Sequence, residues 1–149
     1  MPKSRGRNAG DAGRYNEDSF TSYLDLAGLP YQTQVKFMHP WKKDGRADVL
    51  IMTTPRILVQ NKNQNVSGTC DEKIPFQFDI ARWSHAELVF GEFWLVLGGR
   101  YWSTEGGQLR VNAYCMKAKE FEALMMNRVT AKVLLQPSKS LTLEINKLR

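Results

Sequence analysis

The sequence predicts a single α/β domain with a mixed central sheet. Residues 16–29 have helical spacing, and three apolar runs of strand length follow at 32–38, 45–52 and 56–64. A second helical pattern then precedes a fourth apolar run, at 93–97. At 149 residues the chain is long enough for one domain with its own core, and no apolar run approaches the roughly 20 residues of a membrane span.

The first helix places an acid beside its apolar face. Its apolar residues recur at i, i+3, i+4 and i+7, as Phe20, Tyr23, Leu24 and Ala27, and Gly28 provides a stop. Glu17 lies one turn before Phe20, so the geometry selects it as the acid turned toward the sheet. A first-turn glutamate favoured by the helix dipole explains the same residue equally well.

The second and third strands carry polar residues inside apolar runs. Residues 45–52 and 56–64 are separated by Thr53-Thr54-Pro55, which predicts two neighbouring strands joined by a turn. Side chains two apart share a face of a strand, so Gln60 and Lys62 project together with Leu58. Burying Asp48 and Lys62 between apolar segments is costly unless they are paired, hydrogen-bonded or bound to a metal. These two strands therefore predict a polar site.

The remaining elements follow from the same patterns. We expect a turn at 39–45, a helix capped at 69–71 with Ile74, Phe78 and Ala81 on one face, loops at 98–102 and 106–107, and a helix around 117–128. Residues 133–135 and 141–145 are expected to form two short strands, a C-terminal β addition. Arg100, Tyr101 and Trp102 could contact nucleic acid, fill an interface or fold onto the sheet, and the sequence favours none of these interpretations.

The polar site resembles that of a known superfamily. Asp48, followed after a turn by a strand ending Gln60-Asn61-Lys62, looks like the bipartite signature of the PD-(D/E)XK, or restriction-endonuclease-like, nucleases. Residues 13–17 leading into the first helix, and residues 64–69 with 71–74, resemble further segments of that superfamily. The likeness covers roughly residues 13–100, and glutamine at position 60 replaces the pattern's acid, as in some homing endonucleases of this fold. It implies a core of helix, three strands, helix, strand and helix.

The resemblance implies a metal-dependent nuclease and a set of site residues. The implied catalytic residues are Glu17, Asp48, Gln60, Lys62 and Gln64, and the implied ligands of Mg²⁺ or Mn²⁺ are Asp48, Gln60, Asn61 and Glu17. In this interpretation Lys62 orients the attacking water or stabilises charge on the phosphate, and Gln64 holds the scissile phosphate or a nearby water. The implied substrate is duplex DNA, which we expect to be cut at specific sites, as by homing or restriction endonucleases.

Charge supports a polyanionic partner. The net charge is +6, and we expect residues 1–13 to form a flexible basic arm ahead of a nuclease-like domain at 14–149. The candidate nucleic-acid contacts are Lys3, Arg5, Arg7, Arg14, Lys42, Lys43, Arg46, Lys73 and Arg100, and Lys36 adds to the charge around the predicted turn at 39–45. For a single cation, an ordinary solvated surface is the simpler interpretation.

Three alternatives remain open. The chain could be a Holliday-junction-resolvase-like nuclease, a catalytically inactive nucleic-acid-binding module of the same fold, or a basic α/β interaction protein whose likeness is accidental. We expect a homodimer or higher homo-oligomer, because no separate DNA-reading module is visible in the sequence. The start of the chain lacks an apolar signal segment, so we expect a cytoplasmic protein of a bacterium or of a phage-infected host.

Overall fold

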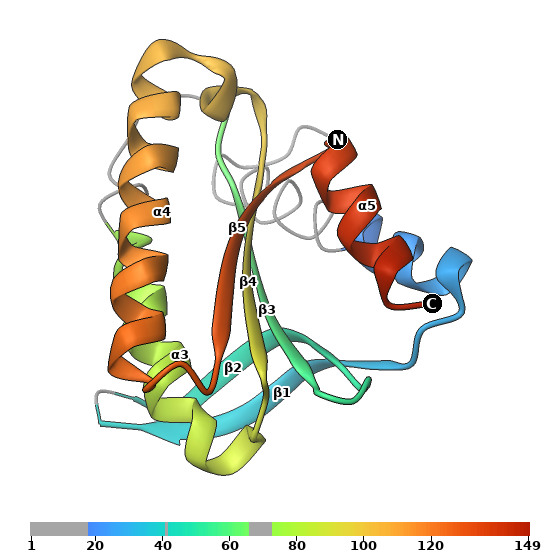
Figure 1. The fold of residues 1–149 in the computed structure, drawn as a ribbon, viewed down its shortest axis with the longest axis vertical. Helices are drawn as coiled ribbons and strands as arrows, with labels where there is room; N and C mark the ends of the chain where they lie inside the picture. Colours follow the sequence, from blue (N-terminus) through green and yellow to red (C-terminus); the bar gives the residue numbers. More distant parts are fainter. Residues whose placement is uncertain (1–17, 41, 66–72) are drawn as a thin grey trace, which may run out of the picture.

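The computed structural model describes residues 18–40, 42–65 and 73–149. Helix 18–27 leads into β1 (Tyr31–His39), β2 (Lys42–Ile51) and β3 (Ile57–Asn63), then α3 (Phe76–Leu88) and β4 (Glu92–Gly98). A 3-10 turn, η1 (Arg100–Ser103), α4 (Glu105–Leu124), β5 (Thr130–Gln136) and α5 (Lys139–Lys147) complete the described chain (Figure 1). The α/β class is confirmed, and no helix in these ranges is long and apolar enough to cross a membrane.

The five strands form one mixed sheet in the order β1-β2-β3-β4-β5. β1, β2 and β3 are an antiparallel meander. β3, β4 and β5 are parallel, and α3 and α4 provide the two crossovers that parallel neighbours require. The turn between β1 and β2 is shorter than predicted, because β2 already begins at Lys42.

Helices cover both faces of this sheet and create two cores. In Figure 1, α3 and α4 lie on one side, and α5 and helix 18–27 lie on the other. Leu58 of β3 is buried in the core under α3 and α4, whereas Ile57 and Val59 are buried in the core under the other two helices. The predicted alternation of β3 is therefore confirmed, and it places Gln60 and Lys62 on the α3 side.

The glycine-rich stretch after β4 is helical, which corrects two predictions. Residues 106–107 lie in the first turn of α4, not in a loop, and that helix begins at Glu105 rather than near residue 117. The Thr104 side chain caps it by accepting a hydrogen bond from the Gly107 N–H at 3.0 Å. Glycine is required at 107 because a Cβ atom there would lie 2.0 Å from the Tyr101 carbonyl oxygen. Residues 100–103 form η1, in which Tyr101 and Trp102 are buried, so both side chains fold into the core.

The predicted C-terminal β addition is half wrong. Residues 133–135 do belong to a strand, β5, but it extends the main sheet beside β4. Residues 141–145 belong to α5, which the Ser138 side chain caps by accepting from the Leu141 N–H. Leu141 and Ile145, one turn apart, are buried, whereas Leu143 is 57% exposed. The period is therefore helical, and the alternation of three apolar residues was misleading.

An ionic cluster fastens α5 to the sheet. Lys132 of β5 forms ion pairs with Glu92 of β4, at 2.9 Å, and with Glu144 of α5, which also pairs with Lys147 at 3.2 Å. Burial alone would raise the pKa of the Glu144 carboxyl, but the hydrogen bonds from Lys132 and Lys147 outweigh it and lower this pKa below its usual range. The cluster is therefore stabilising while Glu144 is ionised.

We expect Lys132→Met to lower the free energy of unfolding by about 1 kcal/mol at pH 7, less than the full value of charge-assisted hydrogen bonds because Lys132 stays 37% exposed. A carboxyl group with a lowered pKa contributes stability above its unfolded pKa and loses it as pH falls. The difference from wild type should therefore shrink below about pH 4. Denaturant titrations at both pH values measure it, with Lys117→Met, which removes an exposed ion pair to Glu120, as the control. An equal loss at both pH values would contradict this role of Glu144.

Candidate functional site

The β2–β3 ladder opens where the predicted site begins. Its paired residues run from Ile51 opposite Ile57 to Val49 opposite Val59. Just beyond, side chains take over the hydrogen bonding. The Asp48 N–H donates to Gln60 Oε1 at 3.2 Å, and the Asn61 N–H donates to Asp48 Oδ2 at 2.7 Å. Asp48 and Gln60 are thus fixed against each other by both main chain and side chain.

Asp48 lies where β2 changes the face that it buries. Ala47 belongs to the core under α3, whereas Val49 belongs to the core on the opposite face of the sheet. On the neighbouring strand β1, Thr33 pairs with Val49 and Val35 pairs with Ala47. Gln34 lies between them and has a left-handed backbone, with φ of 51°. A positive φ in a residue other than glycine is strained, and such irregularities re-aim side chains next to functional sites.

Asp48, Gln60 and Lys62 line one hollow of about 160 Å³. Gln60 is buried, whereas Asp48 and Lys62 are half-buried, so a carboxylate and an amine face a small space that solvent can reach. The other lining residues are Phe37, Gly45 and Arg46 from the β1–β2 hairpin and Gln77 and Ile80 from α3. Of the five implied catalytic residues, Asp48, Gln60 and Lys62 thus line one hollow.

Gln77 is the polar lining residue that sequence reasoning missed. It lies in the first turn of α3, and Ile80 follows it three residues later. Residues three apart on a helix lie on one edge, so Gln77 and Ile80 reach the same hollow beside the buried stripe of Phe78 and Ala81. That spacing was the available signal, but only the packing of α3 against β1 identifies the edge.

Gln64 and Asn61 lie near the site without lining the hollow. The Gln64 main chain is fixed, since its N–H donates to the Gly98 carbonyl and its carbonyl accepts from the Tyr101 N–H. Gln64 is only 7% exposed, and both atoms of its side-chain amide are buried without a hydrogen-bond partner in the described ranges. A buried amide in this state is uncommon, and it marks Gln64 as a group that needs a water or a ligand. Asn61 contributes its main-chain N–H to Asp48.

The remaining predicted residues are distributed as follows. Glu17, Lys3, Arg5, Arg7 and Arg14 lie outside the described residues, as do the side chains of Lys42 and Lys43, whose main chain begins β2. Arg46, Lys73 and Arg100 are exposed. The predicted basic surface is therefore described only in part.

The oxygen donors of the hollow suit a hard cation. The Asp48 carboxylate and the Gln60 amide oxygen come from adjacent strands, and oxygen ligands are what magnesium and manganese prefer. Within residues 18–40, 42–65 and 73–149, however, no three histidine, cysteine or acidic side chains gather at one point. The Gln60 oxygen also already accepts from Asp48. Any cation here would take its further ligands from main-chain oxygens such as the Asn61 carbonyl, from water or substrate, or from residues outside these ranges.

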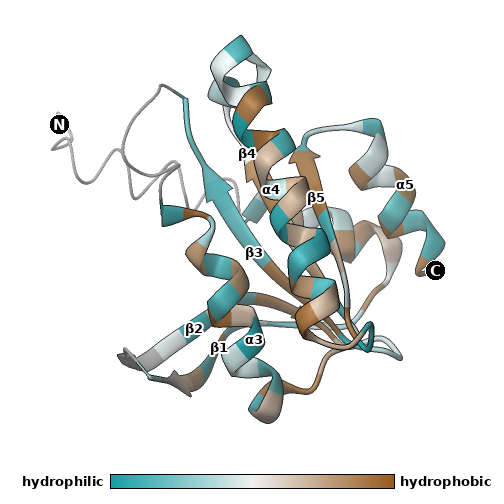
Figure 2. Cartoon of the chain, turned by 60° about the vertical axis from the view of Figure 1, so that its left-hand side comes forward, coloured by the Kyte–Doolittle hydropathy of each residue, from teal (hydrophilic) through white to brown (hydrophobic). Residues whose placement is uncertain are grey.

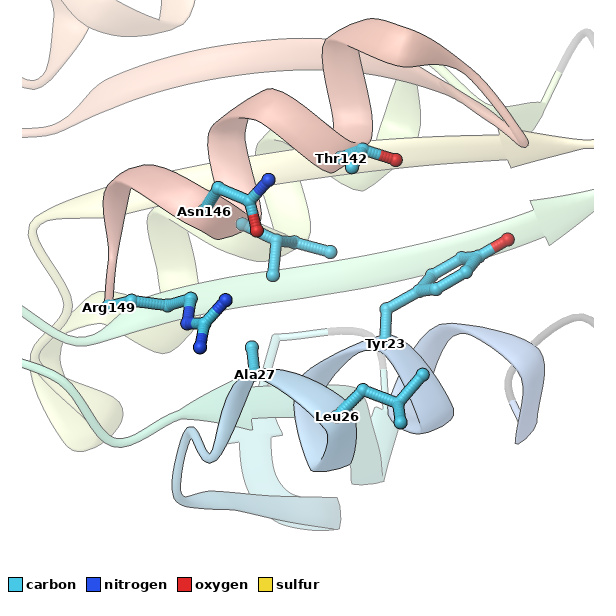
Figure 3. Close-up of a pocket in the computed structure, with 7 residues that line it drawn as sticks. Tyr23, Leu26, Ala27, Thr142, Asn146 and Arg149 are labelled. Atoms are coloured by element: carbon cyan, nitrogen blue, oxygen red, sulfur yellow. The ribbon is translucent and has the colours of Figure 1, made fainter.

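A second hollow, of similar volume, lies between helix 18–27 and α5 (Figure 3). Its lining residues are Tyr23, Leu26, Ala27, Thr142, Ile145, Asn146 and Arg149. None of these seven is acidic, and in Figure 3 apolar side chains of the N-terminal helix face Asn146 and Arg149. It lies on the face of the sheet opposite the hollow of Asp48 and lacks its carboxylate–amine pair.

Comparison with known proteins gives a likeness of fold. No family model and no curated protein matches the sequence. A solved structure, "Crystal Structure of Protein of Unknown Function AF1548", is similar over 86% of this chain, with a TM-score of 0.51 and 15% sequence identity. This chain spans 63% of the length of that protein. At this identity the similarity concerns the fold alone.

Proposed function

We propose that this protein is a divalent-metal-dependent endonuclease that hydrolyses phosphodiester bonds of duplex DNA at specific sites. The observation that carries the proposal is the single hollow lined by Asp48, Gln60 and Lys62 at the point where β2 and β3 separate. The order of helix, three strands, helix, strand and helix supports it, because it is the order expected of a restriction-endonuclease-like core. The net charge of +6 suits a polyanionic substrate.

The lining residues divide the chemistry among them. Asp48 and Gln60 would hold Mg²⁺ or Mn²⁺, with Glu17 and the Asn61 carbonyl as the further ligands implied by the family resemblance. A bound divalent cation would supply an activated water and neutralise charge on the phosphate. The Lys62 ammonium lies in the same hollow, where it holds a phosphate oxygen or the attacking water. Phe37 and Ile80 form apolar walls that limit solvent on one side of these groups.

A non-catalytic nucleic-acid-binding module is the second candidate, and one observation favours it. The Gln60 oxygen accepts the Asp48 N–H and its nitrogen donates to the Arg46 carbonyl at 3.5 Å, so both ends of the amide already serve the strand junction. A glutamine with both amide atoms engaged in this way fits a site in which residue 60 stabilises the strand junction and does not bind metal. The hollow would then bind a phosphate through Lys62 without cleaving it.

Nicking of supercoiled plasmid separates these candidates. The nuclease requires Mg²⁺ or Mn²⁺, loses activity in excess EDTA and, being site-specific, yields discrete fragments from a phage genome rather than a ladder. A junction-resolvase-like enzyme cuts synthetic four-way junctions in preference to linear duplex. Retarded DNA in EDTA together with no cleavage in either metal would establish the binding module. We also expect a dimer in solution, measurable by light scattering, because two cuts in one duplex require two hollows.

A further inference from the structure

Two cations are paired across the β1–β2 hairpin. Lys36 of β1 lies directly opposite Arg46 of β2, and both are exposed. Their neighbours, Phe37 and Gly45, are also paired but are buried on the α3 side. Because opposite residues of an antiparallel pair project to the same face, Lys36 and Arg46 share the face of the hairpin that points away from α3. This face is the cation face of the hairpin.

The pairing is unfavourable in the isolated protein. Like charges directly opposite on one face repel each other, and neither cation forms an ion pair with another residue in the described ranges. Glu87 of α3 reaches the hairpin, but its Oε2 accepts from the Met38 N–H at 3.1 Å. No ion pair in the described ranges therefore offsets the repulsion, whereas one phosphate bound between the two side chains would.

The hairpin has the shape and position of a groove-reading element. It is a two-stranded ribbon, and in Figure 2 its free end extends at the lower left beyond α3. A ribbon of this kind fits the major groove of duplex DNA. Arg46 is two residues from Asp48, which is about 7 Å along the strand. Its side chain projects to the face of the ribbon opposite the hollow, which α3 lines with Gln77 and Ile80, so the two cations hold a phosphate other than the one at the hollow. Met38, 63% exposed, offers an apolar contact on the same ribbon.

We propose that the β1–β2 hairpin enters the major groove of duplex DNA and that Lys36 and Arg46 jointly hold one backbone phosphate. This inference rests on the proposed function, since it concerns how the same substrate is bound beside Asp48. Duplex RNA is the wrong partner, because its major groove is too deep and narrow for a protein ribbon. In this proposal the repulsion between Lys36 and Arg46 lowers the stability of the free protein, and a bound phosphate relieves it.

The charge reversal Lys36→Glu tests the inference through two readouts of opposite sign. It replaces the repulsion by an attraction to Arg46, so the melting temperature of the free protein should rise. Binding to a 30-base-pair duplex in EDTA, measured by fluorescence anisotropy, should weaken at least about tenfold at low salt. Lys36→Ala should flatten the log–log salt dependence by about 0.9, the value for one lost phosphate contact. The matched control is Lys119→Glu, the same charge reversal on an exposed residue of α4.

The outcomes distinguish this inference from the proposed function. If Lys36→Glu and Lys119→Glu weaken binding equally, net charge alone acts and the hairpin assignment is overturned, even where the wild type nicks plasmid. Equal affinity for duplex RNA overturns the groove assignment. If Lys36→Glu raises stability and weakens DNA binding while no metal supports cleavage, the hairpin assignment stands and the nuclease proposal fails.

Discussion

Replacing Lys62 with methionine is expected to lower metal-dependent plasmid nicking at least about a hundredfold, the usual effect of removing one group that stabilises transition-state charge. Methionine keeps most of the length of the side chain, so the half-buried position on β3 stays filled. The folded state should therefore survive, which circular dichroism and thermal melting measure. DNA affinity in EDTA should change by less than tenfold, since one contact among several is lost.

The matched control is Lys119→Met, which removes the same charge from the exposed face of α4. It should leave the nicking rate unchanged. Asp48→Asn should act like Lys62→Met, because asparagine retains an acceptor for the Asn61 N–H but loses the negative charge. Full nicking by folded Lys62→Met protein would exclude Lys62 from the chemistry.

The strands that carry the site were predictable because their patterns are local. Alternation along 56–64 separates Leu58 from Ile57 and Val59, and the structure buries them in different cores. The turn at Thr53-Thr54-Pro55 then fixes which strand is the neighbour. The two-residue period of a strand and the pairing of β2 with β3 together bring Asp48 and Lys62 to the same face of the sheet.

The features that were missed depend on contacts between distant parts of the chain. Gly107 was predicted to lie in a loop. The contact that requires glycine at this position, with the Tyr101 carbonyl, exists only once η1 has formed, so the sequence does not show it. The α5 segment is apolar at Leu141, Leu143 and Ile145, and this spacing fits the period of a strand about as well as that of a helix. In the structure the Ser138 side chain caps the segment as a helix. Where the apolar pattern is this short, sequence alone cannot select between them.

The hydrogen bonding of Gln60 was also beyond sequence reasoning, and it changes the interpretation of that residue. Glutamine at this position looks like a weakened metal ligand, but in the structure its amide replaces two ladder hydrogen bonds at the strand junction. The oxygen accepts from Asp48 and the nitrogen donates to the Arg46 carbonyl. A glutamate could reproduce the first of these contacts but not the second, because an ionised carboxylate has no N–H to donate.

Gln60→Glu is therefore expected to have opposite effects without and with metal. In EDTA the variant should melt at a lower temperature, since it loses the N–H that donates to the Arg46 carbonyl and sets a second carboxylate beside Asp48 with no bound metal ion. Magnesium should bind the free variant at least about tenfold more tightly than the free wild type, because one added negative charge at about 4 Å attracts a divalent cation by about 2 kcal/mol even in bulk water, and tenfold corresponds to about 1.4 kcal/mol. Calorimetry measures the affinity, and the magnesium-induced rise in melting temperature should be larger in the variant.

The same Gln60 contacts predict how the wild type acquires its metal. With one carboxylate in the described part of the hollow and the Gln60 oxygen shared with Asp48, magnesium affinity should be low in the free protein and should rise when duplex DNA supplies a phosphate oxygen. Gln77→Glu, which places a carboxylate in the same hollow but on α3, is the control for added charge and should raise the free-protein affinity less, because Gln60 and not Gln77 contacts Asp48 in the described structure. The Gln60→Glu variant need not cut faster, because tighter ground-state binding of metal does not by itself stabilise the transition state.

If the wild type binds magnesium as tightly without DNA as with it, another acid completes the site. If neither protein binds metal under any condition, the hollow belongs to a binding module.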